Sequence, residues 1–238
     1  MQKYIGRWEA LSGNIRGSII ILIASLVSVL MSSLIKHVGQ TIPVIEILFF
    51  RQIMVLIIIS PVILKNRATV FRSSIYGMHF LRATLSIFAM YLGFSAVVNM
   101  PLAEVTAISF ARILFTTILA IIFLREVVGI RRWTSVIFGF VGVLVIIRPD
   151  PDNIDLYALM AVASALFVSA VQILLRKISQ IDNASTILVF HSVTIALVMS
   201  IPTYFQWVMP SLDEMLFIVI HQAYEALTDE TKRAKLRA

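Results

Sequence analysis

The stretch Leu102–Leu124, LAEVTAISFARILFTTILAIIFL, has 23 residues and only two charged side chains, Glu104 and Arg112. The hydrocarbon layer of a bilayer is about 30 Å thick, so a helix rising about 1.5 Å per residue needs about 20 apolar residues to cross it. Backbone amides have no water partner in lipid, so only helices and closed barrels span it, and this stretch lacks the alternation of a barrel strand. The stretch therefore predicts a transmembrane helix.

Six further apolar runs have the same character, with short polar connectors between them: Gly17–Ile35, Pro43–Leu64, Ile75–Val97, Trp133–Ile147, Leu156–Leu175 and Ser185–Phe205. The chain of 238 residues has a mean hydropathy of +0.94 and 14% charged residues, whereas soluble domains carry about 25%. These features predict an all-α, polytopic membrane helix bundle with the lipid bilayer around it. Leu212–Ile220 begins an eighth helix, so we expect about seven to eight spans.

Basic residues are concentrated in alternate connectors of this predicted bundle. One set of connectors carries Lys3, Arg7, Arg16, Lys65, Arg67, Arg72, Arg125, Arg131, Arg132, Arg176 and Lys177. The other set carries only Lys36 and Arg148. Because basic loops stay on the cytoplasmic side, this asymmetry predicts a cytoplasmic N-terminus. It also accounts for the net charge of +7, so no nucleic-acid partner is expected.

The chain contains an approximate internal repeat. Gly17–Leu64 and Leu156–Phe205 each read as a helix with small residues, a basic exit and an apolar-aromatic step, Phe49-Phe50-Arg51 in one and Val189-Phe190-His191 in the other. Since a unit of five spans is odd, the second copy must enter the membrane inverted, as in many secondary transporters. The expected organisation is a cytoplasmic segment 1–16, a five-helix repeat 17–148, an external acidic linker 149–155, a partial second repeat 156–220 and a charged tail 221–238.

Five stretches, taken in order, resemble the EamA domain of the drug/metabolite transporter superfamily over Gly17–Ile220. They are Glu46–Arg51, Tyr91–Phe94, Pro101–Ala107, Phe123–Glu126 and Gly139–Leu144. Within that family the chain looks most similar to the bacterial branch with S-adenosylmethionine uptake carriers. The resemblance implies ten helices in two inverted five-helix repeats in the inner membrane, both termini cytoplasmic, and a small-molecule substrate crossing by alternating access. The chain supplies fewer helices than that, so the second repeat is expected to be incomplete.

Three arginines lie inside predicted spans, where each costs roughly 2.5–3.5 kcal/mol to insert and therefore faces a partner or a wet interior. They are Arg51, Arg82 and Arg112. His79, Arg82 and Ser86 form a helical stripe at i, i+3 and i+7, and Ser109, Arg112 and Thr116 repeat that spacing. Two such stripes on successive helices indicate a shared polar interior.

The acids Glu46 and Glu104 stand near the outer ends of their spans and Glu126 near an inner end, so the middle of the bundle has more cations than anions. This balance favours a substrate that carries a carboxylate or phosphate. His191, at the repeat position of Arg51, could couple a proton. The predicted substrate-binding residues are Arg51, Arg82, Arg112, Glu46, Glu104, His79, Tyr91 and Ser109. The alternative for each is structural: ion pairing between helices, a helix-end charge, or packing for Tyr91.

Enzyme motifs are absent from the sequence, as are nucleotide-binding loops and cysteines, so no catalysis, cofactor or metal is expected. Two other interpretations stay open. One is a truncated or fused, transport-inactive remnant that needs a homodimer or a complementing chain. The other is a seven-helix receptor, although Ser185–Phe205 contains no lysine that could hold a retinal.

Overall fold

The computed structural model describes residues 32–65, 70–125, 129–147 and 155–220, together with 22, 26, 27, 29 and 30, and every regular element among them is a helix. The helices are α3 (Val44–Lys65), α5 (Tyr76–Asn99), α6 (Leu102–Ser109), α7 (Ala111–Leu124), α8 (Ile130–Ile147), α9 (Leu156–Ile178) and α10 (Ala184–Phe205). Residues 32–38 and 212–220 are also helical, so the predicted start of an eighth helix is confirmed. Most of the predicted first span, most of the acidic linker and the charged tail lie outside the described residues.

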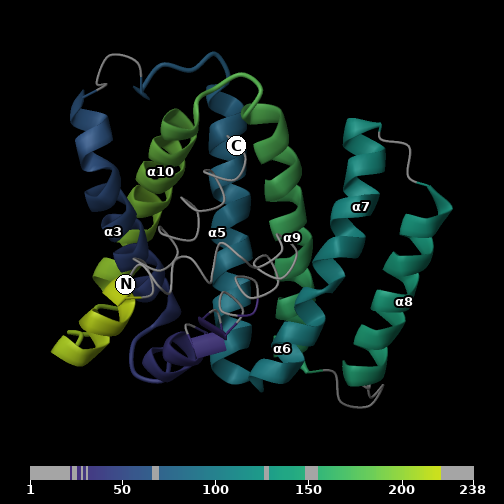
Figure 1. The fold of residues 1–238 in the computed structure, drawn as a ribbon. Coiled ribbons are helices and arrows are strands. Elements are labelled where there is room, and N and C mark those ends of the chain that lie inside the picture. The colour runs from purple at the N-terminus through teal and green to yellow at the C-terminus, as the bar shows by residue number, and fades with distance from the viewer. Residues whose placement is uncertain are drawn as a thin grey trace, which may run out of the picture.

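Five segments of the described chain are long and apolar enough to cross a membrane: Val44–Pro61, Tyr76–Asn99, Leu102–Leu124, Leu156–Ile178 and Ala184–Phe205. The helices stand side by side with their axes roughly aligned, as Figure 1 shows. The predicted all-α, multi-pass membrane bundle is therefore confirmed.

The span Leu102–Leu124 is broken, which the sequence pattern did not predict. The chain turns at Phe110, whose N–H donates to the carbonyls of Ala107 and Ile108, and α7 starts after it. Two hydroxyls bond back within this helix: Thr106 Oγ1 donates to Leu102 O at 2.6 Å, and Ser109 Oγ donates to Thr106 O at 2.6 Å. Hydroxyls that bond to carbonyls in their own helix favour a bend at such a position.

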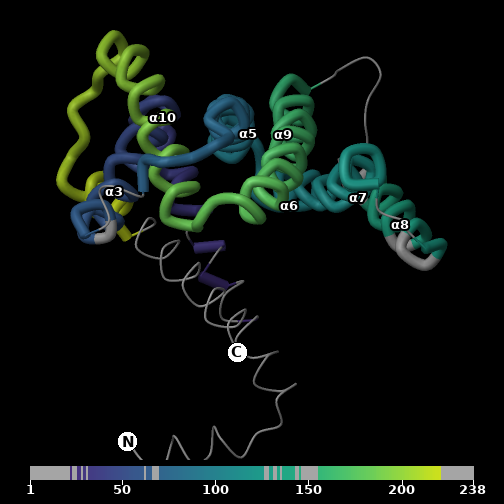
Figure 2. Tube along the Cα trace, turned by 90° about the horizontal axis from the view of Figure 1, so that it is seen from above, coloured from purple at the N-terminus to yellow at the C-terminus, as the bar shows by residue number. Residues whose placement is uncertain are grey.

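The second half of the chain is inserted between helices of the first half. From one side of the bundle to the other the order is α3, α10, α5, α9, α7 and α8, in both the side view and the view from above (Figure 1 and Figure 2). The α5–α9 interface is close because Gly93 lies opposite Ser164, and a Cβ at Gly93 would come within 2.7 Å of Ser164 Oγ. Ser164 Oγ also donates to Ala89 O at 2.7 Å, so a small residue and a hydroxyl join these helices.

Two connections of the bundle have the same pattern of backbone hydrogen bonds. The N–H groups of residues 39, 40, 41 and 42 donate to the carbonyls of 35, 37, 38 and 38, and those of 179, 180, 181 and 182 donate to 175, 177, 178 and 178. The two patterns match bond for bond at a constant offset of 140 residues. Figure 1 shows the first connection at the bottom of the bundle and the second at the top, so the two matching turns lie at opposite ends of the bundle.

The described charges also separate by end. The end that contains the 179–183 connection carries the basic residues Lys65, Arg72, Arg125, Arg176 and Lys177, and we call it the basic end. The opposite end carries Lys36 and the acidic residues Glu46, Glu104, Asp155, Asp213 and Glu214, and we call it the acidic end.

Candidate functional site

The meeting faces of α3, α5 and α10 carry polar side chains inside otherwise apolar spans. We call these the central polar cluster: Arg51 and Gln52 of α3, Arg82 and Ser86 of α5, and His191 and Ser192 of α10. Gln52, Arg82, Ser86 and Ser192 are buried, and Arg51 and His191 are half-buried. Arg51 and His191 are each the eighth residue of their helix, so each lies about 10 Å from the membrane end where that helix starts.

The 3.6-residue period of the helix places the polar groups of α5 on one face. His79, Arg82 and Ser86 are all buried, so the stripe predicted on the third span is an interior face of α5. Between the polar groups, Ala83 of α5 packs with Ile195 and Met199 of α10, and Phe49 of α3 packs against them. Apolar packing therefore holds the three helices together around the polar groups.

Several atoms of the cluster have no hydrogen-bond partner in the described part of the chain. They are Gln52 Oε1, Arg82 Nε, Ser86 Oγ, His191 Nδ1 and Ser192 Oγ. Gln52 Nε2 lies 3.9 Å from Met90 Sδ, and Arg51 Cζ lies 5.7 Å from the centroid of the Phe94 ring, a cation–π distance. A buried polar group without a partner destabilises a fold by about 1–3 kcal/mol, so these atoms are available to a polar solute.

The charge of the cluster is positive. The side chains of Arg51 and Arg82 lie close enough to His191 for their charges to act on its ring. The sequences of α5 and α10 contain no acid, and Glu46 of α3 stands in the first turn at the acidic end. An anionic group is therefore the chemical complement of this region.

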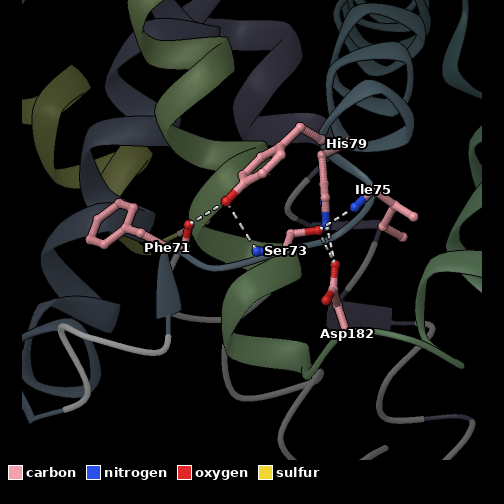
Figure 3. A network of polar contacts seen from close by, with 6 residues as sticks. Phe71, Ser73, Ile75, His79 and Asp182 are labelled. Atoms are coloured by element: carbon pink, nitrogen blue, oxygen red, sulfur yellow. Dashed lines mark hydrogen bonds and ion pairs between the residues drawn. The ribbon is translucent and has the colours of Figure 1, made fainter.

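His79, which the sequence grouped with Arg82, lies instead in a contact at the basic end (Figure 3). Asp182 Oδ2, in the α9–α10 connection, is 2.7 Å from His79 Nε2 and accepts a hydrogen bond from Ser73 Oγ at 2.6 Å. The His79 ring also stacks on Phe190 with centroids 4.9 Å apart. Burial raises the pKa of Asp182, but the hydrogen bonds from Ser73 and His79 outweigh it, so its pKa lies below the ordinary value.

A second contact lies at the acidic end. Thr41 Oγ1 donates to Glu214 Oε1 at the start of the helix 212–220, and Gln40 Nε2 donates to Val98 O at 3.0 Å. Glu46 is 1% exposed, and its Oε2 accepts a hydrogen bond from the Val208 N–H at 3.1 Å. Glu46 therefore joins the start of α3 to the segment that follows α10.

The remaining predicted residues lie outside the central polar cluster. Glu104 is half-buried in the first turn of α6, and Tyr91, Ser109 and Arg112 are exposed. The backbone carbonyl of Arg112 accepts a hydrogen bond from Ser169 Oγ at 3.0 Å. The structure thus brings Arg51 and Arg82 toward His191 and leaves Ser109, at the end of α6, and Arg112 of α7 apart from them. Glu126 lies outside the described residues.

Gln52, Ser192 and Asp182 were not predicted. Gln52 and Ser192 had a signal, because each is a polar residue inside an apolar run next to a residue already singled out. Asp182 had none, since it is 103 positions from His79 and only the fold brings them together. Within the part of the chain described, no group of three His, Cys, Asp or Glu side chains could hold a metal ion.

The chain has relatives among characterised membrane carriers. It is 29% identical over 186 residues to the S-adenosylmethionine uptake transporter of Rickettsia bellii, a match covering 78% of this chain and 64% of that protein. It is 29% identical over 153 residues to the riboflavin transporter of Vibrio cholerae, covering 63% of this chain and 50% of the relative. A pseudopaline exporter of Pseudomonas aeruginosa is 23% identical over 187 residues, 78% of this chain and 65% of that protein. No solved structure matches.

The family model described as "EamA-like transporter family" matches residues 15–148, more than half of the chain. The matched region contains α3 and α5 to α8, and with them Arg51 and Arg82 of the central polar cluster. With multiple apolar spans, polar groups between the halves and an inverted connection, the chain belongs to the EamA-like transporter family.

Proposed function

We propose that the chain acts in the secondary transport of a small metabolite by alternating access, with the substrate held between the two inverted halves. The observation that carries this proposal is the central polar cluster. It gathers two arginines, a histidine and unpartnered polar atoms from α3, α5 and α10 within apolar spans. Polar residues inside membrane spans are costly, and in transporters they mark the substrate path at the repeat interface.

The substrate we propose is S-adenosylmethionine or another solute that carries a carboxylate. The cationic balance of α3, α5 and α10 supports an anionic group, because a planar guanidinium binds a carboxylate through two parallel hydrogen bonds. The name of the Rickettsia bellii relative supports S-adenosylmethionine, and that of the Vibrio cholerae relative makes riboflavin the comparison substrate.

The location we propose is the bacterial inner membrane, with the basic end and the N-terminus on the cytoplasmic side. The separation of charges supports this orientation, because basic connectors are retained in the cytoplasm. The proposed repeats are 17–148 and 156–220, with the linker 149–155 outside the cell.

The test is uptake of labelled S-adenosylmethionine into cells that express the chain, its Arg82→Ala variant and its Arg72→Ala variant. Arg82 is 7% exposed inside α5, whereas Arg72 is exposed and precedes it, so the pair separates a change in the cluster from the mere loss of an arginine. We expect Arg82→Ala to reduce uptake at least about tenfold, which corresponds to a loss of about 1.4 kcal/mol of binding free energy. We expect uptake by Arg72→Ala to stay within about twofold of the parent chain, a difference of about 0.4 kcal/mol.

Other outcomes select the alternatives. Uptake only by a version extended through a full second repeat, or only beside a complementing chain, would mean that this chain does not carry substrate by itself. Loss of uptake in Arg112→Ala but not in Arg82→Ala would move the path to the exposed face of α7. A response to the ligand without flux would favour the receptor interpretation.

A further inference from the structure

The contacts at the two ends of the bundle are chemically reciprocal. At the basic end the α9–α10 connection supplies a carboxylate, Asp182, and the segment just before α5 supplies a hydroxyl, Ser73. At the acidic end the connection supplies a hydroxyl, Thr41, and the start of the helix 212–220 supplies a carboxylate, Glu214. The α9–α10 connection therefore contacts the segment that leads from α3 into α5, and the connection before α3 contacts the helix 212–220 that follows α10.

The repeat offset places the two contacts at nearly equivalent positions. Asp182 is the counterpart of Ile42, and Ile181 is the counterpart of Thr41, at the offset of 140 residues that the matching hydrogen bonds define. Under the same offset Glu214 corresponds to Ser74, the neighbour of Ser73. In each connection the residue that makes the contact is therefore displaced by one position from the residue that makes it in the other connection.

Both contacts are small and lie at the boundary of the spans. The basic-end contact has one carboxylate oxygen shared by two side chains, with the His79 ring stacked on Phe190, which precedes His191 of the central polar cluster. The acidic-end contact includes the hydrogen bonds from Gln40 to Val98 O and from Lys36 to Met100 O, which hold the connection against the end of α5. Helix α5 is therefore tied to a different connection at each of its ends.

We propose that these two contacts control access to the central polar cluster, one from each side of the membrane. Asp182 holds the basic side closed through Ser73 and His79, and Thr41 with Glu214 holds the acidic side closed. Asp182 and Glu214 are positioning residues in this scheme, because they act on the helices and not on the substrate. The proposal rests on the proposed transport by alternating access, which requires that each side open while the other stays closed.

The repeat itself supplies the variants for the test. Asp182→Ile and Thr41→Ile each install the type of residue that the other connection carries at the equivalent position, Ile42 and Ile181, so each turn keeps a residue that its backbone accepts. The chain contains no cysteine, so reporter cysteines can be read without background. Gln52→Cys and Ser192→Cys are repeat counterparts and are 2% and 0% exposed, respectively, in this structure.

The experiment measures the rate at which a membrane-impermeant maleimide labels each reporter in the full chain, in right-side-out and inside-out vesicles. Ser179→Cys and Asn99→Cys, exposed at the basic and acidic ends, define which face the reagent reaches. We expect Asp182→Ile to raise labelling of the Ser192→Cys reporter at least about tenfold from the basic side, a shift of about 1.4 kcal/mol in the opening equilibrium. We expect Thr41→Ile to raise labelling of the Gln52→Cys reporter from the acidic side, and neither variant to raise it from the other side.

Each variant serves as the control for the other, and Asp155→Asn is the matched control for loss of an aspartate. Asp155 caps α9 by accepting a hydrogen bond from the Tyr157 N–H at 2.9 Å, a role that asparagine also fills. Unchanged labelling in both variants, or equal increases from both sides, would overturn the proposal. If Asp182→Ile does not insert, the double variant Ser73→Ala/His79→Leu removes both side-chain partners of the Asp182 carboxylate and is read in the same way.

The labelling needs no substrate, so its result is independent of the uptake test. Labelling that increases from one side only, without uptake of S-adenosylmethionine, would support the role of the two contacts and contradict the proposed substrate. Uptake together with labelling that ignores both contacts would retain transport and remove this inference.

Discussion

At the scale of single residues, Arg82 is the least expected side chain in the bundle. It is 7% exposed, it lies in a helix with no acid, and its Nε has no hydrogen-bond partner in the described structure. Insertion of an arginine near the centre of a span costs roughly 2.5–3.5 kcal/mol, and neither α5 nor α10 contains a carboxylate that would offset that cost. We therefore propose that Arg82 is retained for the group that it binds.

The first prediction follows from this imbalance. Arg82→Met should raise the thermal stability of the detergent-solubilised chain while it reduces substrate uptake at least about tenfold, about 1.4 kcal/mol of lost binding. The stability gain follows because methionine fills similar volume without a buried charge. Thermal unfolding and initial uptake rates check the two halves separately. A variant that is less stable than the parent chain would mean that Arg82 is a structural partner.

Asp182 gives a prediction on pH. Its pKa is below the ordinary value in the folded chain, so the ionised form stabilises the fold above the unfolded pKa of about 3.9, and that contribution is lost as pH falls through the lower, folded value. The difference in melting temperature between the parent chain and Asp182→Asn should therefore shrink as the pH falls below about 4. A difference that stays unchanged or grows as the pH falls from about 4 to about 2 would contradict the assignment.

The sequence predicted which polar residues share a buried face where those residues recur at helical spacing on one helix. The buried stripe of His79, Arg82 and Ser86 was visible because a 3.6-residue period places all three on one face. The same reasoning grouped Arg112 with Arg82, yet the structure exposes Arg112, because spacing on a helix does not say which face meets a neighbour. Whether Arg112 contacts substrate stays a prediction.

At the scale of elements, close approach decides the α5–α9 interface. Two glycines of α5 allow a matched comparison: a Cβ at Gly93 would meet Ser164 Oγ at 2.7 Å, whereas a Cβ at Gly77 would meet nothing within 4 Å. Gly77→Ala should stabilise the helix by up to about 1 kcal/mol, the ordinary difference in helix propensity. Gly93→Ala has the same gain in helix propensity, but it should lower the stability of the fold because its Cβ would collide with Ser164 Oγ.

Rescue checks the reason for that loss. Ser164→Ala removes the hydroxyl that a new methyl group would strike, so the double variant should recover most of the stability that Gly93→Ala loses. Thermal unfolding of the four proteins measures the coupling, which for residues in contact is about 0.5–3 kcal/mol. Additive effects would mean that Gly93 acts through some other neighbour.

The helix boundaries were within three residues of the predicted runs at each end of α3, α5, α8, α9 and α10. Apolar runs locate spans well because lipid requires an uninterrupted helix. The break at Phe110 was missed because hydropathy registers the apolar character of the run and not a change of backbone direction within it.

At the scale of the whole molecule, the sequence alone predicts the orientation of the bundle in the membrane, because that prediction uses the charges of the connectors and not the packing of the helices. The described charges separate by end, and the positive-inside rule then predicts that the basic end faces the cytoplasm. In intact cells, an impermeant maleimide should label Asn99→Cys and leave Ser179→Cys unlabelled until the membrane is opened. The reverse pattern would invert the proposed orientation while leaving the fold unchanged.

The order of the helices could not be predicted from one sequence. Nothing in the apolar runs says that α10 packs between α3 and α5, or that Asp182 meets His79 across 103 positions. The proposed inverted repeat narrows the choice of arrangement, but contacts between the halves depend on side chains far apart in the chain.

The placement of α10 between α3 and α5 has a consequence for biosynthesis. Arg51 and Arg82 leave the ribosome more than 100 residues before His191 does, so α3 and α5 enter the membrane while the helix that covers their polar faces is still unmade. During that interval the nascent chain has to keep two guanidinium groups away from acyl chains. Release of the first half into lipid before α10 is made would therefore leave each guanidinium with an insertion cost of roughly 2.5–3.5 kcal/mol until the second half arrives.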